Sequence, residues 1–327
     1  MIRVRAASRL HFGLFNVGLL PAWPNIDGDQ LIPGRRFGGV GMMVDLPGIE
    51  VRSQPAGAWS ASGPMAERAL AFAQRFATTA PELRPQHIEV ATQSLPHVGL
   101  GTGTQLALGV AKALAVLSGH TEWGAVELAR RVGRGLRSAI GIHGFDHGGF
   151  LVEAGKHVDS EVSPLVARCE VPSAWRILLM APHVSPGYSG DAERMAFDVL
   201  LQQARPQEVE SLCRLVLLGM LPALAAGDCR AFGEAVYDFN ARAGDIFASQ
   251  QGGRYAPPLV GEIVKYCRDQ GISGVGQSSW GPTVFAILPD EMSAERLRTS
   301  LACAYGRRLE QVFIAKVRNC GATVSET

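Results

Sequence analysis

The chain has 327 residues, of which 47% are hydrophobic and 19% charged, so it can bury a large core and does not belong to the disordered class. Its length favours two domains of about 150 residues each. The 31 basic and 30 acidic residues leave a net charge of +1, which argues against a protein that holds nucleic acid by charge alone.

The segment Met1–Arg5 alternates apolar and basic side chains and predicts a β-strand, because no apolar core of a secretory signal follows it. We find no stretch that approaches the roughly 18 apolar residues of a membrane span. The six cysteines are scattered without a C-x-x-C pair. We therefore expect a cytoplasmic protein with reduced thiols and without structural zinc.

Periodicity predicts the elements of the first half. Strands are expected over 1–53, interrupted by the Gly/Pro-rich segment Gly18–Gly34, which we interpret as a hairpin loop or, over Pro21–Gly34, a lid. The further elements expected are a helix over 65–79, a strand over His87–Ala91, helices over Leu106–Leu117 and Glu122–Leu136, a glycine-rich bend over Gly141–Gly149 and a strand over Phe150–Glu153.

The pattern weakens over Val158–Val171, and we place there the boundary between a domain 1–165 and a domain 166–327. Beyond it we expect strands over Trp175–Ala181, Gly281–Leu288 and Gln311–Val317, and helices over Ala192–Gln203, Val209–Ala226, Ala231–Ser249, Pro258–Asp269 and Met292–Tyr305. Because the helices are grouped rather than strictly alternating with strands, the pattern is typical of the α+β class.

Three glycines and two threonines precede the first strongly apolar helix, in the segment Pro96–Gln105. Glycines let backbone amides approach an anion, and the first amides of a helix lack partners inside it. The helix dipole adds positive character, so phosphate is a natural ligand, and Thr102 or Thr104 could offer a hydroxyl to Mg²⁺. The lysine of the common phosphate-binding loop is missing, and a capped helix after a flexible turn is the alternative.

Two further clusters carry polar residues. Arg9 and His11 share one face of the first strand if it continues, which suits a carboxylate or phosphate, although both could lie on a solvated face. The segment Arg137–Gly149 is dense in glycine and polar residues, as active-site loops are. Within it Asp146 could act as a base, bind Mg²⁺ or cap a turn. The glycines argue against a helix that would present His143 and His147 together to a metal.

Four arginines, Arg130, Arg131, Arg134 and Arg137, form a local basic cluster in an otherwise neutral chain. Near the other end, Gly274–Thr283 precedes a strand and contains further candidates. Gln277, Ser278 and Ser279 supply hydrogen bonds, and Trp280 supplies a flat face that could cover an aromatic ring or a sugar. Alternatively, Trp280 fills the junction between the domains.

In their order these motifs resemble the GHMP kinase superfamily over nearly the whole chain. The resemblance implies an N-terminal domain like domain 2 of ribosomal protein S5 and a ferredoxin-like C-terminal domain, with the ligand in the cleft between them. Phosphates would lie on the loop Gly99–Thr104.

The chain also departs from the kinases. Gly103 stands where they usually have a second serine, Gln105 follows Thr104, and Trp280 occupies a loop that is normally glycine and serine. These departures resemble one branch, the β-ribofuranosylaminobenzene 5′-phosphate synthase family. The resemblance rests on four segments, Ser8–Leu14, Arg36–Gly41, His97–Gln105 and Gly276–Pro282.

That resemblance implies an enzyme that condenses phosphoribosyl pyrophosphate with 4-aminobenzoate or 4-hydroxybenzoate and releases CO₂ and pyrophosphate. The step belongs to the synthesis of tetrahydromethanopterin. It further implies Mg²⁺ as cofactor and a homodimer, with small-molecule substrates and neither nucleic acid nor membrane as partner.

In such a site, the amides of Gly101–Gln105, Mg²⁺ and Arg137 would stabilise the leaving pyrophosphate. Arg9 with His11, or Arg36, would hold the carboxylate, and Trp280 or Phe12 would cover the ring and exclude water. The candidate residues are Arg9, His11, Arg137 and Asp146 for catalysis; Arg36, Gly99, Gly101, Thr102, Gly103, Thr104, Gln105, Gln277, Ser278, Ser279 and Trp280 for substrate binding; and Thr102, Thr104 and Asp146 for the metal.

Two other functions fit the same motifs. The first is an ATP-dependent kinase of a sugar or polyol, with Asp146 as the base or electrostatic partner of the acceptor hydroxyl. The second is a protein that binds a phosphorylated metabolite without catalysis on the same fold.

Overall fold

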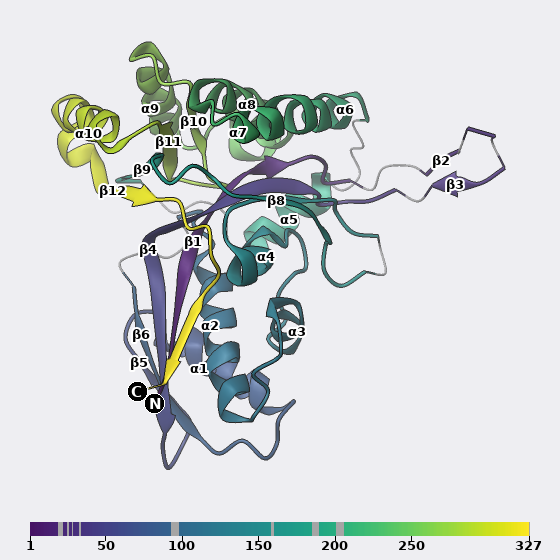
Figure 1. Ribbon diagram of the computed structural model, residues 1–327, viewed down its shortest axis with the longest axis vertical. Helices are drawn as coiled ribbons and strands as arrows, with labels where there is room; N and C mark the ends of the chain where they lie inside the picture. The colour runs from purple at the N-terminus through teal and green to yellow at the C-terminus, as the bar shows by residue number, and fades with distance from the viewer. Residues whose placement is uncertain are drawn as a thin grey trace.

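The computed structural model describes residues 1–18, 22–24, 26–27, 29–32, 34–92, 98–157, 160–184, 190–200 and 206–326. His97, which belongs to the predicted phosphate-loop motif, and part of the predicted lid lie outside these residues. Figure 1 shows two sheets with their helices gathered at opposite ends of the molecule. This arrangement confirms the α+β class.

The first sheet has the strand order β13-β1-β4-β6-β5, and β7 and β8 extend it from β4. Its strands are β1 (Ile2–Leu14), β4 (Gly39–Pro55), β5 (Ser60–Ser62), β6 (Gln86–Ala91), β7 (Phe150–Glu153), β8 (Leu165–Cys169) and β13 (Thr323–Glu326). The helices α1 (Ala66–Ala77), α2 (Thr102–Leu117), α3 (Ala125–Arg131) and α4 (Ile140–His147) form the layer beside it. The long strand β1 pairs with β4 along most of its length, apart from two register shifts.

The second sheet has the order β10-β11-β9-β12 and is antiparallel throughout. Its strands are β9 (Arg176–Pro182), β10 (Gly274–Gln277), β11 (Val284–Leu288) and β12 (Leu309–Lys316). Its helices are α5 (Gly190–Leu200), α6 (Pro206–Leu215), α7 (Leu221–Ala225), α8 (Cys229–Gln251), α9 (Pro258–Asp269) and α10 (Glu291–Tyr305). A strand, helices, two hairpin strands, a helix and a last strand in this order give the ferredoxin-like topology that was expected.

The two halves share one core. Phe12 of β1 is fully buried and packs against Phe150 of β7 and Phe285 of β11, with ring centroids 6.4 and 5.0 Å apart. The same apolar cluster continues to Phe232 and Phe239 of α8. Because one cluster contains side chains from both sheets, the ends of β1 and β10 are held in a fixed relation to each other.

The chain also crosses the boundary predicted at residue 165. Strand β8 spans that position and pairs with β7, and β13 returns from the second half to pair with β1. Between β1 and β4 the sequence holds a small hairpin, β2 (Trp23–Pro24) with β3 (Leu31–Ile32), which stands away from both sheets in Figure 1. The hairpin interpretation of this segment is confirmed, and its action as a lid stays a prediction.

The expected bend over Gly141–Gly149 was wrong, because residues Ile140–His147 form the helix α4. A Cβ atom on Gly144 would lie 2.3 Å from the sulfur of Met43 on β4. The glycine therefore allows close packing of helix on sheet rather than flexibility. The predicted helix Val209–Ala226 is likewise divided by a π-helical turn, Val216–Met220, just before Pro222, which has no amide hydrogen to donate.

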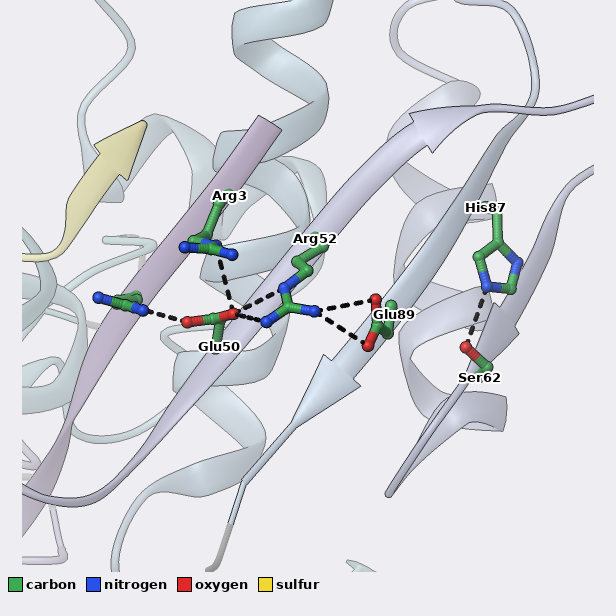
Figure 2. A network of polar contacts seen from close by, with 7 residues as sticks. Arg3, Glu50, Arg52, Ser62, His87 and Glu89 are labelled. Atoms are coloured by element: carbon green, nitrogen blue, oxygen red, sulfur yellow. Dashed lines mark hydrogen bonds and ion pairs between the residues drawn. The ribbon is translucent and has the colours of Figure 1, made fainter. Parts of the chain in front are cut away.

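The sheet face opposite α1–α4 carries a network of charges, shown in Figure 2. Strand alternation buries Val4 and Val51 on the helix side and places Arg3, Glu50 and Arg52 on the other. The Glu50 carboxylate accepts hydrogen bonds from Arg5 at 2.5 Å and from Arg52 at 2.7 Å. Partial burial opposes its ionisation, yet these bonds outweigh the penalty and lower the pKa of Glu50.

In the described part of the chain, every helix is either too short or too polar to cross a lipid bilayer.

Candidate active site

The glycine-rich loop ahead of α2 is held by two other segments. The amide of Arg9 on β1 donates to the Leu100 carbonyl at 2.9 Å, and the Ser278 hydroxyl donates to the Gly99 carbonyl at 2.8 Å. A Cβ atom on Gly99 would lie 2.2 Å from the carbonyl oxygen of Ser278, so only glycine allows the loops to approach so closely. The predicted phosphate loop, the end of β1 and the turn after β10 therefore meet at one place.

A cleft of about 630 Å³ opens beside this meeting point, within the usual size of small-molecule sites. Many of the predicted site residues line it: Arg9, His11, Gly99, Gly101, Thr102, Gly103, Thr104, Arg137, Ser279 and Trp280. Arg68 and Arg134 complete a set of four arginines, and none of the described lining residues is an aspartate or a glutamate. Such a cleft favours a ligand with several negative charges.

Gly103 gives two of these arginines access to the start of α2. A Cβ atom on Gly103 would lie 2.5 Å from a terminal nitrogen of Arg68 and 3.5 Å from one of Arg134. Arg134 donates to the Gly103 carbonyl at 3.3 Å, and its guanidinium lies 4.9 Å from the ring centre of Phe72. Burial lowers the pKa of Arg68, which indicates that this cation is held with little water around it.

Gly101 has a second role, next to Arg9. It caps α2 in the left-handed conformation, with φ of 69°, and a Cβ atom there would lie 3.0 Å from both Cβ and Nε of Arg9. The side chain of Arg9 therefore crosses directly over the loop. The fourth arginine, Arg137, stacks its guanidinium over Phe197 at 4.4 Å from the ring centre, and both residues line the cleft.

The predicted use of the amides at the start of α2 is corrected in part. The amides of Thr104 and Gln105 both donate to the Gly101 carbonyl, at 3.0 and 3.1 Å, so neither is available to a phosphate. The side chain of Gln105 is buried and donates to the Gly141 carbonyl at 2.7 Å. Gln105 therefore connects α2 to α4.

The turn after β10 divides into structural and cleft-lining residues. Gln277 is buried, accepts from the Ala256 amide at 3.0 Å, and lies beside a smaller pocket rather than the cleft. Ser278 is fully buried and accepts from the His11 amide at 3.1 Å. Ser279 and Trp280 line both the cleft and the smaller pocket, and Ser279 has φ of 56°, which is unusual for a residue with a side chain.

The smaller pocket, of about 60 Å³, adjoins the cleft and shares Trp280 with it as a lining residue. Its aromatic walls are Trp280, Phe197 and Phe247, and the indole meets the two phenyl rings edge to face at 5.6 and 4.9 Å. His11 and Leu14 border both spaces. An aromatic ring that entered the cleft from this side would therefore meet apolar faces at one end and arginines at the other.

Beneath the cleft, His11 begins a chain of hydrogen bonds to a buried carboxylate. Its Nε2 lies 3.1 Å from the Ser138 hydroxyl, which donates to Glu153 at 2.5 Å. The second oxygen of Glu153 accepts from the Ala139 amide at 2.7 Å. Burial, then the positive charge of Arg9, lowers the pKa of His11, whereas burial raises the pKa of Glu153 to about 7.

Besides Gln105, Gln277 and Ser278, two further predicted site residues lie away from the cleft, Asp146 and Arg36. Asp146 accepts from the Ala125 amide at 2.7 Å and so caps the start of α3. Arg36 pairs its backbone with Lys156 and lies over the ring of Phe37 at 5.3 Å. Asp146 therefore caps a distant helix rather than its own turn, which was the alternative expected, and the structure does not bring Arg36 to the other candidates.

The described residues do not form a site that would hold Mg²⁺ by themselves. Thr102 and Thr104 are the only predicted ligands in the cleft, and Asp146 is occupied at α3. Across the described residues, no group of three or more histidine, cysteine, aspartate or glutamate side chains is placed to bind a metal. Because Mg²⁺ prefers carboxylates and phosphate oxygens, an ion here would need its ligands from a phosphorylated substrate.

Three residues of the site were missed in the sequence. Arg68 lies on an amphipathic helix whose charged residues look solvent-facing, and Ser138 was only one polar residue among many. Glu153 could have been found, because it ends the otherwise apolar strand Phe150–Val152, where a carboxylate is unusual.

The chain is similar to known proteins in sequence. The family described as GHMP kinases C terminal matches residues 220–308. A relative from Archaeoglobus fulgidus named beta-ribofuranosylphenol 5′-phosphate synthase is 30% identical over 346 aligned positions, covering 99% of each chain. A relative of the same name from Methanothermobacter thermautotrophicus is 30% identical and covers 88% of this chain and 89% of its own.

The fold has solved counterparts as well. The crystal structure of homoserine kinase from Cytophaga hutchinsonii matches with a TM-score of 0.69 over 99% of this chain and 97% of its own, at 18% identity, which shows a common fold. The cleft with its four arginines thus belongs to a chain whose full-length relatives carry a synthase name. This protein is a member of the β-ribofuranosylphenol 5′-phosphate synthase family of enzymes, built on the GHMP kinase fold.

Proposed function

We propose that the protein joins the ribose of phosphoribosyl pyrophosphate to the ring of a para-substituted benzoate, with loss of CO₂ and pyrophosphate. The observation that carries this proposal is the cleft itself, with four arginines, no carboxylate among its described lining residues, and an aromatic pocket at one side. A donor with a phosphate and a diphosphate suits the arginines, and a benzoate combines a ring with an anion. The names of the relatives specify a ribosylphenol product, so 4-hydroxybenzoate is the acceptor we favour.

In this proposal Arg68 and Arg134 hold the diphosphate at the start of α2, where the helix dipole adds to their charge. As the bond from C1 of the ribose to the diphosphate breaks, negative charge grows on the leaving group and these fixed cations stabilise it. Mg²⁺ would enter as part of the substrate, bound to the diphosphate oxygens, where it shields their charge. Its requirement is testable by titrating the metal against the donor at fixed enzyme.

Arg9 or Arg137 would hold the carboxylate of the acceptor, with Trp280 against its ring. The walls of Trp280, Phe197 and Phe247 would exclude water from the positively charged C1, since water there would hydrolyse the donor. The expected product belongs to the synthesis of tetrahydromethanopterin, and we expect the enzyme to act as a homodimer in the cytoplasm.

One incubation tests the function. Purified protein, Mg²⁺, phosphoribosyl pyrophosphate and carboxyl-labelled 4-hydroxybenzoate should release labelled CO₂ and pyrophosphate in equal amounts. The same incubation with 4-aminobenzoate ranks the two acceptors. Consumption of ATP with a sugar or polyol, and no CO₂, would instead establish a kinase, and tight binding of the donor without either reaction would establish a binding protein.

A kinase is disfavoured by one arrangement. Phosphoryl transfer to a hydroxyl uses an acidic residue near the acceptor and acidic ligands for the metal. The aspartate expected to serve, Asp146, instead caps α3.

A further inference from the structure

The chain His11–Ser138–Glu153 holds neither the diphosphate nor the carboxylate in the proposed function, yet it leads from the cleft to a carboxylate that is completely buried. Ser138 and His11 both line the cleft, and Glu153 lies behind them at the end of β7. His11 Nε2 faces Ser138, which leaves Nδ1 as the ring nitrogen to meet a ligand. Three groups that can each accept and donate a proton are thus connected by bonds of 3.1 and 2.5 Å.

We propose that Glu153 is a positioning residue that stores the para-hydroxyl proton of the acceptor, through Ser138 and His11, while the new carbon–carbon bond forms. This inference rests on the proposed function and identifies what the buried carboxylate contributes to it.

The reaction needs such a temporary store. When the ring carbon that bears the carboxylate bonds to C1 of the ribose, the C1–O bond breaks and its electron pair leaves with the diphosphate. The hydroxyl oxygen becomes a carbonyl and its proton passes to His11, from His11 to Ser138, and from Ser138 to Glu153. When the bond to CO₂ breaks, its electron pair restores the aromatic ring, and the oxygen takes the proton back by the same route. Because no proton is gained or lost overall, Glu153 must be able to release the proton that it accepted.

Glu153 has the properties of such a group. Its oxygens accept from the Ser138 hydroxyl and the Ala139 amide, and the Ser163 side chain also bonds to it, so these donors are all neutral. Burial raises its pKa to about 7, where a carboxylate can both accept and release a proton at neutral pH.

The surrounding charges are consistent with this role. Arg9 on β1 and Lys156 just after β7 both face Glu153 and favour its ionised form. The ammonium of Lys156 is taken up by the carbonyls of Gly135 and Glu161, at 3.1 Å each, and so does not neutralise Glu153 directly. His143 on α4 donates to the Ser163 carbonyl at 2.8 Å and does not join the chain.

The test compares wild type with Glu153→Gln, which keeps the shape and removes the titrating group. With 4-hydroxybenzoate, wild-type kcat should fall as the pH drops below about 7, because protonated Glu153 cannot accept, and it should be lower in D₂O than in H₂O. In Glu153→Gln, kcat should fall on the order of 100-fold. It should no longer decrease below about pH 7 and should be the same in D₂O and in H₂O. The KM of the phosphoribosyl donor should stay within about twofold, because the arginines that bind it are unchanged.

Glu50→Gln is the matched control, since Glu50 belongs to the same sheet but lies on the face away from the cleft, and it should keep the wild-type pH profile. If Glu153→Gln does not fold, Ser138→Ala breaks the chain at its centre and should give the same flat profile. If a folded variant keeps both the fall of kcat below about pH 7 and the solvent isotope effect, the proposed proton transfer to Glu153 is wrong, while the synthase function stands. A wild-type protein that releases no CO₂ would overturn the proposed function itself.

Discussion

Strand β1 connects two polar regions that use the same residue types in opposite ways. At one end, Arg5 donates to Glu50 on the outer face of the sheet, where Arg52 donates to the same carboxylate (Figure 2). At the other end, Arg9 and His11 face a cleft whose described lining residues include no carboxylate. The carboxylate nearest that end, Glu153, is buried and bonded to neutral donors.

The pKa values of the two carboxylates move in opposite directions for this reason. Arginine donors hold the pKa of Glu50 below its ordinary value despite partial burial, whereas complete burial raises that of Glu153 to about 7. Where arginine and glutamate neutralise each other, the pair is structural. At Glu153, where the hydrogen-bond donors are neutral and burial dominates, the carboxyl group can take up a proton at neutral pH.

The largest difference should separate two arginines of the same basic cluster. Arg134 lines the cleft, whereas Arg130 pairs with Glu127 and Glu161 on the surface. Arg134→Met should lower kcat/KM for the phosphoribosyl donor by about 100-fold or more, since a cation facing a fixed anionic group is worth about 3 kcal/mol. Arg130→Met should change it less than about twofold. Calorimetric titration with pyrophosphate measures the same contrast, and equal losses in both variants would remove Arg134 from the site.

The two carboxylates should also give stability opposite dependences on pH. The pKa of Glu153 is raised from 4.5 to about 7 by folding, so the folded state binds more protons in that interval and stability falls as the pH rises through it. Glu153→Gln removes this loss. The unfolding free energy of the variant minus that of wild type should therefore increase by about 3 kcal/mol from pH 4.5 to 8.

For Glu50→Gln, the difference in unfolding free energy from wild type should change with pH in the opposite direction. The pKa of Glu50 is lowered by folding, so its contribution is present above the unfolded value and is lost as the pH falls. The effect should stay below about 1 kcal/mol, as for other ion pairs near the surface. Urea unfolding at several pH values checks both variants, and parallel curves for the two would contradict the contrast.

A third pair of variants compares the two ends of β1 directly. Arg9→Ala should raise the KM of the benzoate acceptor about tenfold, and more than the KM of the phosphoribosyl donor, if Arg9 holds the carboxylate. Arg5→Ala, which removes one donor to Glu50, should leave both constants unchanged. Steady-state kinetics with each substrate varied in turn distinguish these outcomes. A larger rise for the donor would make Arg9 a phosphate ligand.

The smallest effect concerns Gly101, in the glycine-rich loop over which the side chain of Arg9 passes. Gly101 and Gly119 both have positive φ, 69° and 83°, but a Cβ atom on Gly101 would crowd Arg9 whereas one on Gly119 would meet nothing within 4 Å. Both Gly→Ala variants should lose about 1 kcal/mol of stability from backbone strain. Only Gly101→Ala should also raise the KM of a substrate, by a few fold. A matching rise in Gly119→Ala would assign the effect to general strain in α2.

Much of this could be predicted from the sequence. Period-2 and period-3.6 patterns placed β1, β4 and most helices, and α9 was predicted with the bounds that the structure shows, Pro258–Asp269. The glycine loop, Arg9, His11 and Trp280 were found because glycine and polar residues are unusual directly beside apolar elements.

The predictions that were wrong concerned features that depend on contacts between residues far apart in the sequence. The helix α4 was missed because Gly144 looks like a helix breaker until Met43 of β4 is seen packed against it. The short exposed strand β13 carries little pattern of its own and forms because β1 offers an edge. Asp146 was overvalued and Glu153 overlooked for one common reason, since local sequence shows neither the helix start that occupies the first nor the burial that perturbs the second.

The pairing of β13 with β1 places both ends of the chain side by side, as Figure 1 shows. During synthesis, the edge of β1 that pairs with Thr323–Glu326 has no partner strand until those residues are translated, some three hundred residues after Ile2. Until then the edge of β1 along Ile2–Arg5 is open to other nascent chains, and open strand edges are a recognised route to aggregation. Proteolytic trimming of those four residues would restore that hazard in the mature protein while leaving the arginine cleft intact.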